Sequence, residues 1–165
     1  MVLKHGLTCF GGKVLMNIER AVSLFEERSN GYSCSEAVLL ANARDLGLPC
    51  STALRIASGF AGGMGGMAQT CGLVTGAFMV LGLWFGGESP QDRKAKEITW
   101  EAVRDFSERF HARNGSITCK ELLGHDISNR EDNRMAAQED RYSKVCPGLF
   151  RGTLEILEEM LVSPL

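Results

Sequence analysis

Residues 56–87 of this chain contain no charged side chain at all. Glycines at positions 62, 63, 65 and 66 interrupt the run. The apolar part that follows, roughly residues 71–85, is shorter than the ~20 residues that a helix needs to cross a bilayer. A helix that is apolar on every side is expected at the centre of a soluble bundle. The run therefore predicts an all-α fold built around one central, glycine-rich apolar helix.

Apolar residues recurring at intervals of three and four predict further helices on both sides of this run. We expect them over about residues 13–28, 33–46, 51–58, 90–114, 119–123 and 147–161. Ser33 with Glu36, and Thr118 with Glu121, have the spacing of a capping box at a helix start. The charged residues 125–144 have little periodicity, which indicates a solvated connection with a turn or two of helix after Ser128. No alternating strand pattern is present.

Length and charge limit the classes of function. A chain of 165 residues fits one domain, here taken as 1–165, with residues 1–12 as a flexible N-terminal tail. The net charge of -2 lacks the positive field that nucleic-acid binding requires. The first residues do not form a signal peptide, so we expect a cytoplasmic protein without membrane insertion. The many small and apolar residues expected at the surface of the protein suggest that it forms a homodimer.

The six cysteines are the main functional clue, because thiols in a reducing compartment are more often reduced, metal-bound or redox-active than disulfide-bonded. Four of them fall at or next to predicted helix starts: Cys34, Cys71, Cys119 and Cys146. A helix N-terminus favours a thiolate and lowers the pKa of a cysteine. If these helices converge, one end of the bundle holds four sulfur ligands. Cys9 and Cys50 lack this setting and are expected to be incidental.

The spacing of the cysteines excludes several known sites. No C-x-x-C pair is present, so a zinc ribbon, a thioredoxin motif and a covalent haem site are all absent from the sequence. Any cluster must be assembled by tertiary folding. The alternative is that each cysteine is a small buried hydrophobe.

Two other patterns have competing interpretations. Gly63, Gly65 and Ala68 match a dinucleotide fingerprint, but that motif needs a preceding strand, and the preceding residues are typical of a helix end and a loop. The loop glycines are better explained by a close approach of the backbone to Cys71. His125 could be an extra ligand or a proton carrier, although a solvated turn residue is the more usual reading. The thioethers of Met64 and Met67 could bind a soft metal, but apolar packing is their commoner use.

Four segments of the chain resemble one protein family. They are GYSCSEAVLLA around Cys34, ALRIASGFAGGMGGMAQTCGLVTGAFMVLGL through Cys71, NGSITCKELLGHD at Cys119 and CPGLF at Cys146. In this order they are similar to the C-GCAxxG-C-C family, whose redox label is itself inferred from its cysteines. The resemblance covers about residues 31–161. Leu73 departs from the alanine that is usual in the family hexapeptide.

The resemblance implies redox chemistry at one site. Its catalytic or metal-ligating residues would be Cys34, Cys71, Cys119 and Cys146, with Gly72 and Gly76 as the cofactor-binding glycines. The thiolates would hold an iron-sulfur cluster for electron transfer, or exchange disulfides with Cys71 as the most reactive sulfur. The alternative is a non-redox module that holds zinc or another soft metal. The partner would be an unidentified redox or transport protein.

Overall fold

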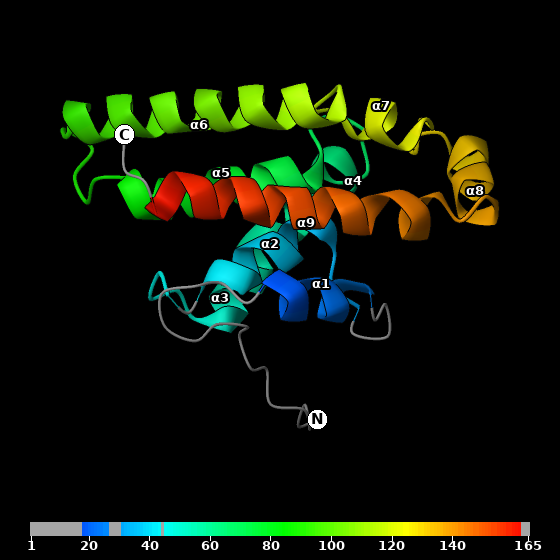
Figure 1. Ribbon diagram of the computed structural model, residues 1–165, viewed down its shortest axis with the longest axis horizontal. Coiled ribbons are helices and arrows are strands. Elements are labelled where there is room, and N and C mark those ends of the chain that lie inside the picture. The colour runs from blue at the N-terminus through cyan, green and yellow to red at the C-terminus, as the bar shows by residue number, and fades with distance from the viewer. Residues whose placement is uncertain (1–17, 27–30, 44, 163–165) are drawn as a thin grey trace.

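The computed structural model describes residues 18–26, 31–43 and 45–162, and this part of the chain is all-α, as the sequence predicts. The N-terminal tail expected over residues 1–12 lies outside it. The helices are α1 (Ile18–Glu26), α2 (Cys34–Ala43), α3 (Cys50–Ala57), α4 (Ala61–Met64), α5 (Gly72–Phe85), α6 (Arg93–Asn114), α7 (Cys119–Leu123), α8 (Arg130–Gln138) and α9 (Arg141–Val162). In Figure 1, α6 and α9 run side by side along the longest axis, and α7 and α8 lie at one end.

The predicted central helix is confirmed. α5 packs against α2, α6 and α9, and Leu73, Val74 and Leu81 within it are fully buried. Its glycines allow the closest of these contacts, because a Cβ on Gly76 would lie 2.8 Å from the Cβ of Val38 in α2. No helix in the described residues has the length and apolar character needed to span a membrane.

The segment before the glycine loop is also helical. α3 leads into a short 3₁₀ turn, Ser58–Phe60, so the strand that a dinucleotide fingerprint requires is not there. The loop itself has an unusual backbone: Gly62, Gly63, Gly65 and Gly66 all have positive φ, and so does Met64. The glycines adopt this conformation without a steric penalty from a Cβ.

Two helix starts differ from the prediction. α6 begins at Arg93 rather than near Pro90, because Asp92 Oδ1 accepts the N–H of Ala95 at 2.9 Å and caps the helix. α9 begins at Arg141 rather than at Pro147, which lies inside it. Proline has no N–H to donate, so α9 has one backbone hydrogen bond fewer at this point.

Candidate functional site

Three of the four cysteines lie at helix starts, as predicted. Cys34 is the first residue of α2, and Ser33 before it donates its N–H and hydroxyl to Glu36 Oε2 at 2.9 and 2.7 Å. Cys71 is the N-cap of α5, and Cys119 is the first residue of α7. The capping-box spacing thus identified two of these helix starts from the sequence.

Cys146 corrects the prediction. It lies inside α9, one turn or more beyond the first residue Arg141, so it is not at a helix N-terminus. The misplacement follows from taking Pro147 as the first helical residue. Cys146 is nonetheless 7 % exposed and belongs to the buried core. Its position therefore depends on the packing of α9 and not on a helix cap.

A short backbone pairing holds Cys71 and Cys119 together, and the sequence interpretation missed it. Thr70 and Thr118 form an isolated antiparallel bridge. On either side of it, the Cys71 N–H donates to Ile117 O at 2.8 Å, and the Cys119 N–H donates to Gln69 O at 2.7 Å. The β-branched residues that precede both cysteines were the available signal, since such side chains favour extended backbone.

Two glycines bring backbone against the cysteines. A Cβ on Gly63 would lie 2.8 Å from the Cβ of Cys119, and one on Gly72 would lie 3.1 Å from the Cβ of Cys34. The close approach that we expected at Cys71 is therefore found at Cys119 and Cys34. For Gly72 and Gly76, proposed from the sequence as cofactor-binding, the contacts with α2 supply a packing reason.

The four thiols influence one another. None of the four forms a disulfide, and the Cys34 and Cys146 side chains are hydrogen-bonded. Cys34 is also near enough to Cys71 and Cys119 to raise the pKa of each. Cys34 is partly exposed, whereas Cys71, Cys119 and Cys146 are 5, 6 and 7 % exposed. Folding thus gathers sulfurs from four helices around Cys34.

The acidity of these thiols is opposite to our expectation. Burial raises the pKa of Cys71 far above that of a free thiol, and the neighbouring Cys34 raises it further. The N–H groups of Leu73 and Val74, at the start of α5, lower the pKa of Cys71, but by less than burial raises it. The helix N-terminus therefore acts as predicted and is outweighed by desolvation.

The other two buried thiols behave alike. Burial, with Cys34 as the second cause, raises the pKa of Cys119 to about 12. The hydrogen bond with Cys34, followed by burial, raises the pKa of Cys146 even more. All three thiols are therefore protonated at neutral pH.

In the reduced protein, we expect the free energy of unfolding to fall as the pH rises above about 8.5, the pKa of free cysteine. The thiols of the unfolded chain then ionise, whereas the buried thiols stay protonated, so the unfolded state is favoured. For Cys119 with a pKa of about 12, this loss reaches about 2 kcal/mol at pH 10. Urea unfolding at pH 7 and pH 10 measures it. Cys119→Ser should lose correspondingly less stability between the two pH values, and an equal loss would contradict the assignment.

The remaining sulfurs have other surroundings. Cys50, expected to be incidental and away from a helix start, is the first residue of α3 and is disulfide-bonded. Cys9 lies outside the described residues. Met67 is 57 % exposed. Met64 lines an apolar hollow of about 410 Å³ together with Phe60, Thr70, Thr75, Phe78 and Met79. Met64 thus has apolar neighbours, as expected for packing.

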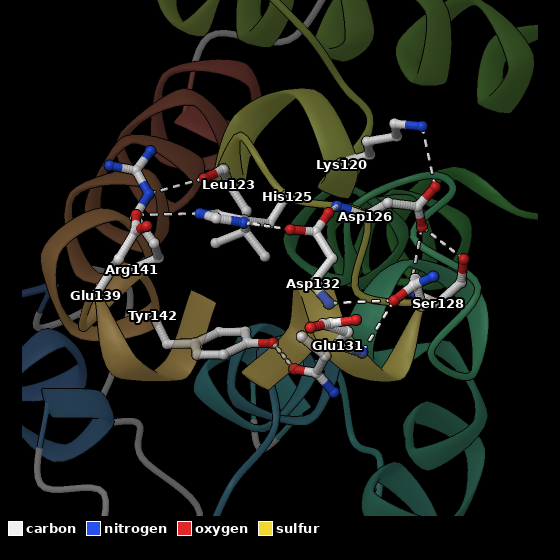
Figure 2. A network of polar contacts seen from close by, with 12 residues as sticks. Lys120, Leu123, His125, Asp126, Ser128, Glu131, Asp132, Glu139, Arg141 and Tyr142 are labelled. Carbon is white, nitrogen blue, oxygen red and sulfur yellow. Dashed lines mark hydrogen bonds and ion pairs between the residues drawn. The ribbon is translucent and has the colours of Figure 1, made fainter. Parts of the chain in front are cut away.

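His125 is not the solvated turn residue that we favoured. Its side chain is 11 % exposed, with Nδ1 2.6 Å from Asp132 Oδ1 and Nε2 3.1 Å from Glu139 Oε2. Figure 2 shows the imidazole held between these two carboxylates. Nearby, Arg141 Nε donates to Leu123 O at 2.8 Å. The charged segment after α7 is therefore an ordered network, which its weak periodicity did not reveal.

Within the described residues, no group of three or more His, Cys, Asp or Glu side chains is arranged to hold a metal ion. Among the four thiols, Cys34 and Cys146 are joined by a hydrogen bond. The site contains three buried thiols with raised pKa values, and one of them, Cys146, is hydrogen-bonded to Cys34.

Comparison with known proteins identifies one family. No match was found among curated proteins or among solved structures. One family model, described as "Putative redox-active protein", matches residues 32–160, a span that contains all four cysteines of the site. The chain therefore belongs to the C-GCAxxG-C-C family.

Proposed function

We propose that the protein is a dithiol redox protein in which Cys34 and Cys146 form a reversible disulfide. The observation that carries the proposal is the hydrogen bond between these two side chains. Thiols in such contact need only a small movement to form a sulfur-sulfur bond, which gives them a high effective concentration. Cys71 and Cys119 belong to the same site as buried neighbours.

The proposed reaction begins at Cys34, because it is the more exposed thiol of the pair. Its thiolate attacks one sulfur of an external disulfide and displaces the other sulfur as a thiol. Cys146 then gives up its proton and attacks the Cys34 sulfur, which releases the second external thiol. Two electrons pass to the external disulfide, and the two protons end on the released thiols. In the cytoplasm, the compartment that the sequence favours, glutathione disulfide is such an oxidant.

Cys71 has a different role in this proposal from the one that the sequence suggested. Its burial keeps it away from an external disulfide, and Cys146 rather than Cys71 is the thiol hydrogen-bonded to Cys34. We assign Cys71 and Cys119 to the walls of the site, where they keep Cys34 and Cys146 away from bulk water. Reactivity is then concentrated in one pair.

An iron-sulfur cluster or a zinc ion is the competing use of these cysteines. Such metals bind thiolates, so their ligands must lose protons. Three of the four thiols instead hold their protons more tightly than free cysteine does. Because disulfide exchange needs thiolates as well, acidity does not separate the two uses, and the hydrogen-bonded pair is what favours the dithiol. Metal analysis separates the two uses directly.

The test combines metal analysis with disulfide mapping. Protein purified without oxygen is first assayed for iron, sulfide and zinc, and then equilibrated with oxidised and reduced glutathione. We expect less than stoichiometric metal, and a disulfide between Cys34 and Cys146 found by mass spectrometry of the digested protein. Cys34→Ser and Cys146→Ser should each abolish that disulfide. Cys71→Ser, which changes a buried neighbour in the same way, is the matched control and should retain it.

Two results would overturn the proposal. Stoichiometric iron with sulfide, or one tightly held zinc per chain, would show that the cysteines are ligands. A disulfide that forms between another pair, or that survives in Cys146→Ser, would show that the hydrogen-bonded pair is not the redox pair.

A further inference from the structure

The chain between Cys119 and Cys146 folds back on itself and is closed by three hydrogen bonds. Arg141 Nε donates to Leu123 O at 2.8 Å, which joins the start of α9 to the end of α7. Tyr142 Oη donates to Asn133 Oδ1 at 2.6 Å, and Lys144 Nζ donates to Glu139 O at 2.8 Å. We call residues 120–145 the brace, because they connect the helices that carry Cys119 and Cys146.

His125 lies at the centre of the brace (Figure 2). Its two ring nitrogens face the carboxylates of Asp132, at 2.6 Å, and Glu139, at 3.1 Å. A carboxylate can only accept a hydrogen bond, so both contacts are satisfied together when the imidazole carries two N–H groups, that is, when it is protonated. The protonated form is therefore the one that matches this geometry.

Among the charged groups of this network, His125 is the one expected to change its charge near neutral pH. Beside it, the Asp126 N–H donates to Asp132 Oδ2 at 2.5 Å, and the Asp126 carboxylate pairs with Lys120 of α7 at 2.9 Å. The charged residues that face the network from α9 are Arg141 and Lys144. Carboxylates, lysines and arginines all keep their charge between about pH 5 and pH 9, whereas histidine does not.

We propose that the brace is a proton-dependent device that positions the thiol site, with His125 as its positioning residue. When His125 is protonated, the brace holds the start of α9 in place and keeps Cys146 within reach of Cys34. When His125 loses its proton, the start of α9 loosens and the Cys34–Cys146 disulfide becomes less favourable. This inference rests on the proposed function and adds its regulation.

The loosening is expected at Glu139. A neutral imidazole has one N–H and can keep only one of its two carboxylate contacts. The Asp132 contact is the shorter one, and the Asp132 side chain is 32 % exposed against 54 % for Glu139. Glu139 follows the last residue of α8 and precedes Asp140, whose carbonyl accepts from the N–H of Lys144 in the first turns of α9. Loss of the Glu139 contact therefore weakens the connection between α8 and α9, the helix that carries Cys146.

The direction of the pH effect follows from the two carboxylates. The hydrogen bond with Asp132, and next that with Glu139, raise the pKa of His125 above its usual value. A raised histidine pKa means that the stabilisation is fully present below about pH 6.5, the value in the unfolded chain, and is lost as the pH rises through the folded-state value. The brace is therefore more stable below the pKa of His125 than above it.

The first test uses the fully reduced protein and does not depend on disulfide formation. Nuclear magnetic resonance titration should give a His125 pKa above about 6.5. Hydrogen-exchange protection of the amides from Asp140 to Cys146 should fall several-fold as the pH passes that value, after correction for the intrinsic rate. His125→Gln should remove this pH dependence. Glu139→Gln should lower the His125 pKa, and it serves as the second variant should His125→Gln unfold.

A matched control lies in α8, the helix that Glu139 follows. Glu131 pairs with the exposed Arg134 at 3.7 Å, so Glu131→Gln makes the same change of side chain as Glu139→Gln without touching the His125 contacts. It should leave the His125 pKa and the protection of residues 140–146 unchanged. A His125 pKa at or below about 6.5, or the same drop in protection in His125→Gln, would overturn the brace.

The second test links the brace to the thiol site. The Cys34–Cys146 disulfide is equilibrated with glutathione between pH 6 and pH 8, a range in which glutathione itself stays largely protonated. Disulfide formation should become several-fold less favourable across this range in the unmodified protein and stay constant in His125→Gln. If no Cys34–Cys146 disulfide forms at any pH, the proposed function fails and the brace loses its regulatory role. A disulfide with the same pH dependence in both proteins overturns the brace alone.

Discussion

Gly63→Ala is expected to lower the free energy of unfolding by about 2–5 kcal/mol, because two costs add. Gly63 has a φ of 68°, where an L-residue costs about 1–2 kcal/mol. An added Cβ would also lie 2.6 Å from the backbone N of Gln69 and 2.8 Å from the Cβ of Cys119. Such overpacking costs about 1–3 kcal/mol. The Gln69 carbonyl accepts the Cys119 N–H, so the clash would disturb the hydrogen bond that positions Cys119.

Gly66→Ala separates the two costs. Gly66 has a φ of 82° in the same loop, but nothing lies within 4 Å of the position that its Cβ would take. We expect a loss of only about 1–2 kcal/mol in this variant. For a chain of this size, the midpoint of thermal unfolding should fall by about 4–20 °C in Gly63→Ala and by about 2–8 °C in Gly66→Ala, with the larger fall in Gly63→Ala. Equal losses would show that the contact with Cys119 and Gln69 has no cost.

Gly76→Ala is expected to destabilise the protein by about 1–2 kcal/mol, although alanine is the better helix former. Gly76 lies where α5 crosses α2, and a Cβ there would be 2.8 Å from Val38 Cβ and 3.1 Å from Ser35 O. These atoms belong to a buried helix, so they can move only with its backbone. The variant should push α2 and its first residue Cys34 away from α5.

Gly82→Ala is the matched control in the same helix. Nothing lies within 4 Å of the position of its added Cβ, so only the helix propensity changes. We expect a gain of about 0.5–1 kcal/mol. The two substitutions are chemically identical, and urea unfolding should show opposite signs. A loss of stability in both would mean that α5 does not tolerate alanine for a reason other than the contact with α2.

The acidity of the cysteines illustrates why local sequence signals were insufficient for the site. Cys71 has the predicted setting at a helix start, with the N–H groups of Leu73 and Val74 lowering its pKa. Burial nevertheless dominates, because removing a thiolate from water costs more than two backbone dipoles return. Burial depends on which helices pack over Cys71, and a pattern of residue types along the chain does not contain that information.

The boundaries of the helices also show which features depend on near neighbours in the sequence and which depend on tertiary packing. The capping-box spacing located the starts of α2 and α7, since a cap involves residues only three positions apart. The start of α9 was missed, because Pro147 is an acceptable first residue of a helix and the sequence offers no reason to continue the helix before it. The additional turns pack against α8 and carry Arg141 and Tyr142, whose partners are distant in sequence.

The amino-acid sequence by itself determined the all-α fold, the buried position of α5, the family and the placement of Cys34, Cys71 and Cys119 at helix starts. These depend on periodicity and on contacts between near neighbours in the chain. Tertiary structure alone decided that Cys34 meets Cys146, that Cys71 and Cys119 are joined through Gln69 and Ile117, and that two carboxylates enclose His125. Each of these joins residues from different elements, and such contacts form only when the whole core packs.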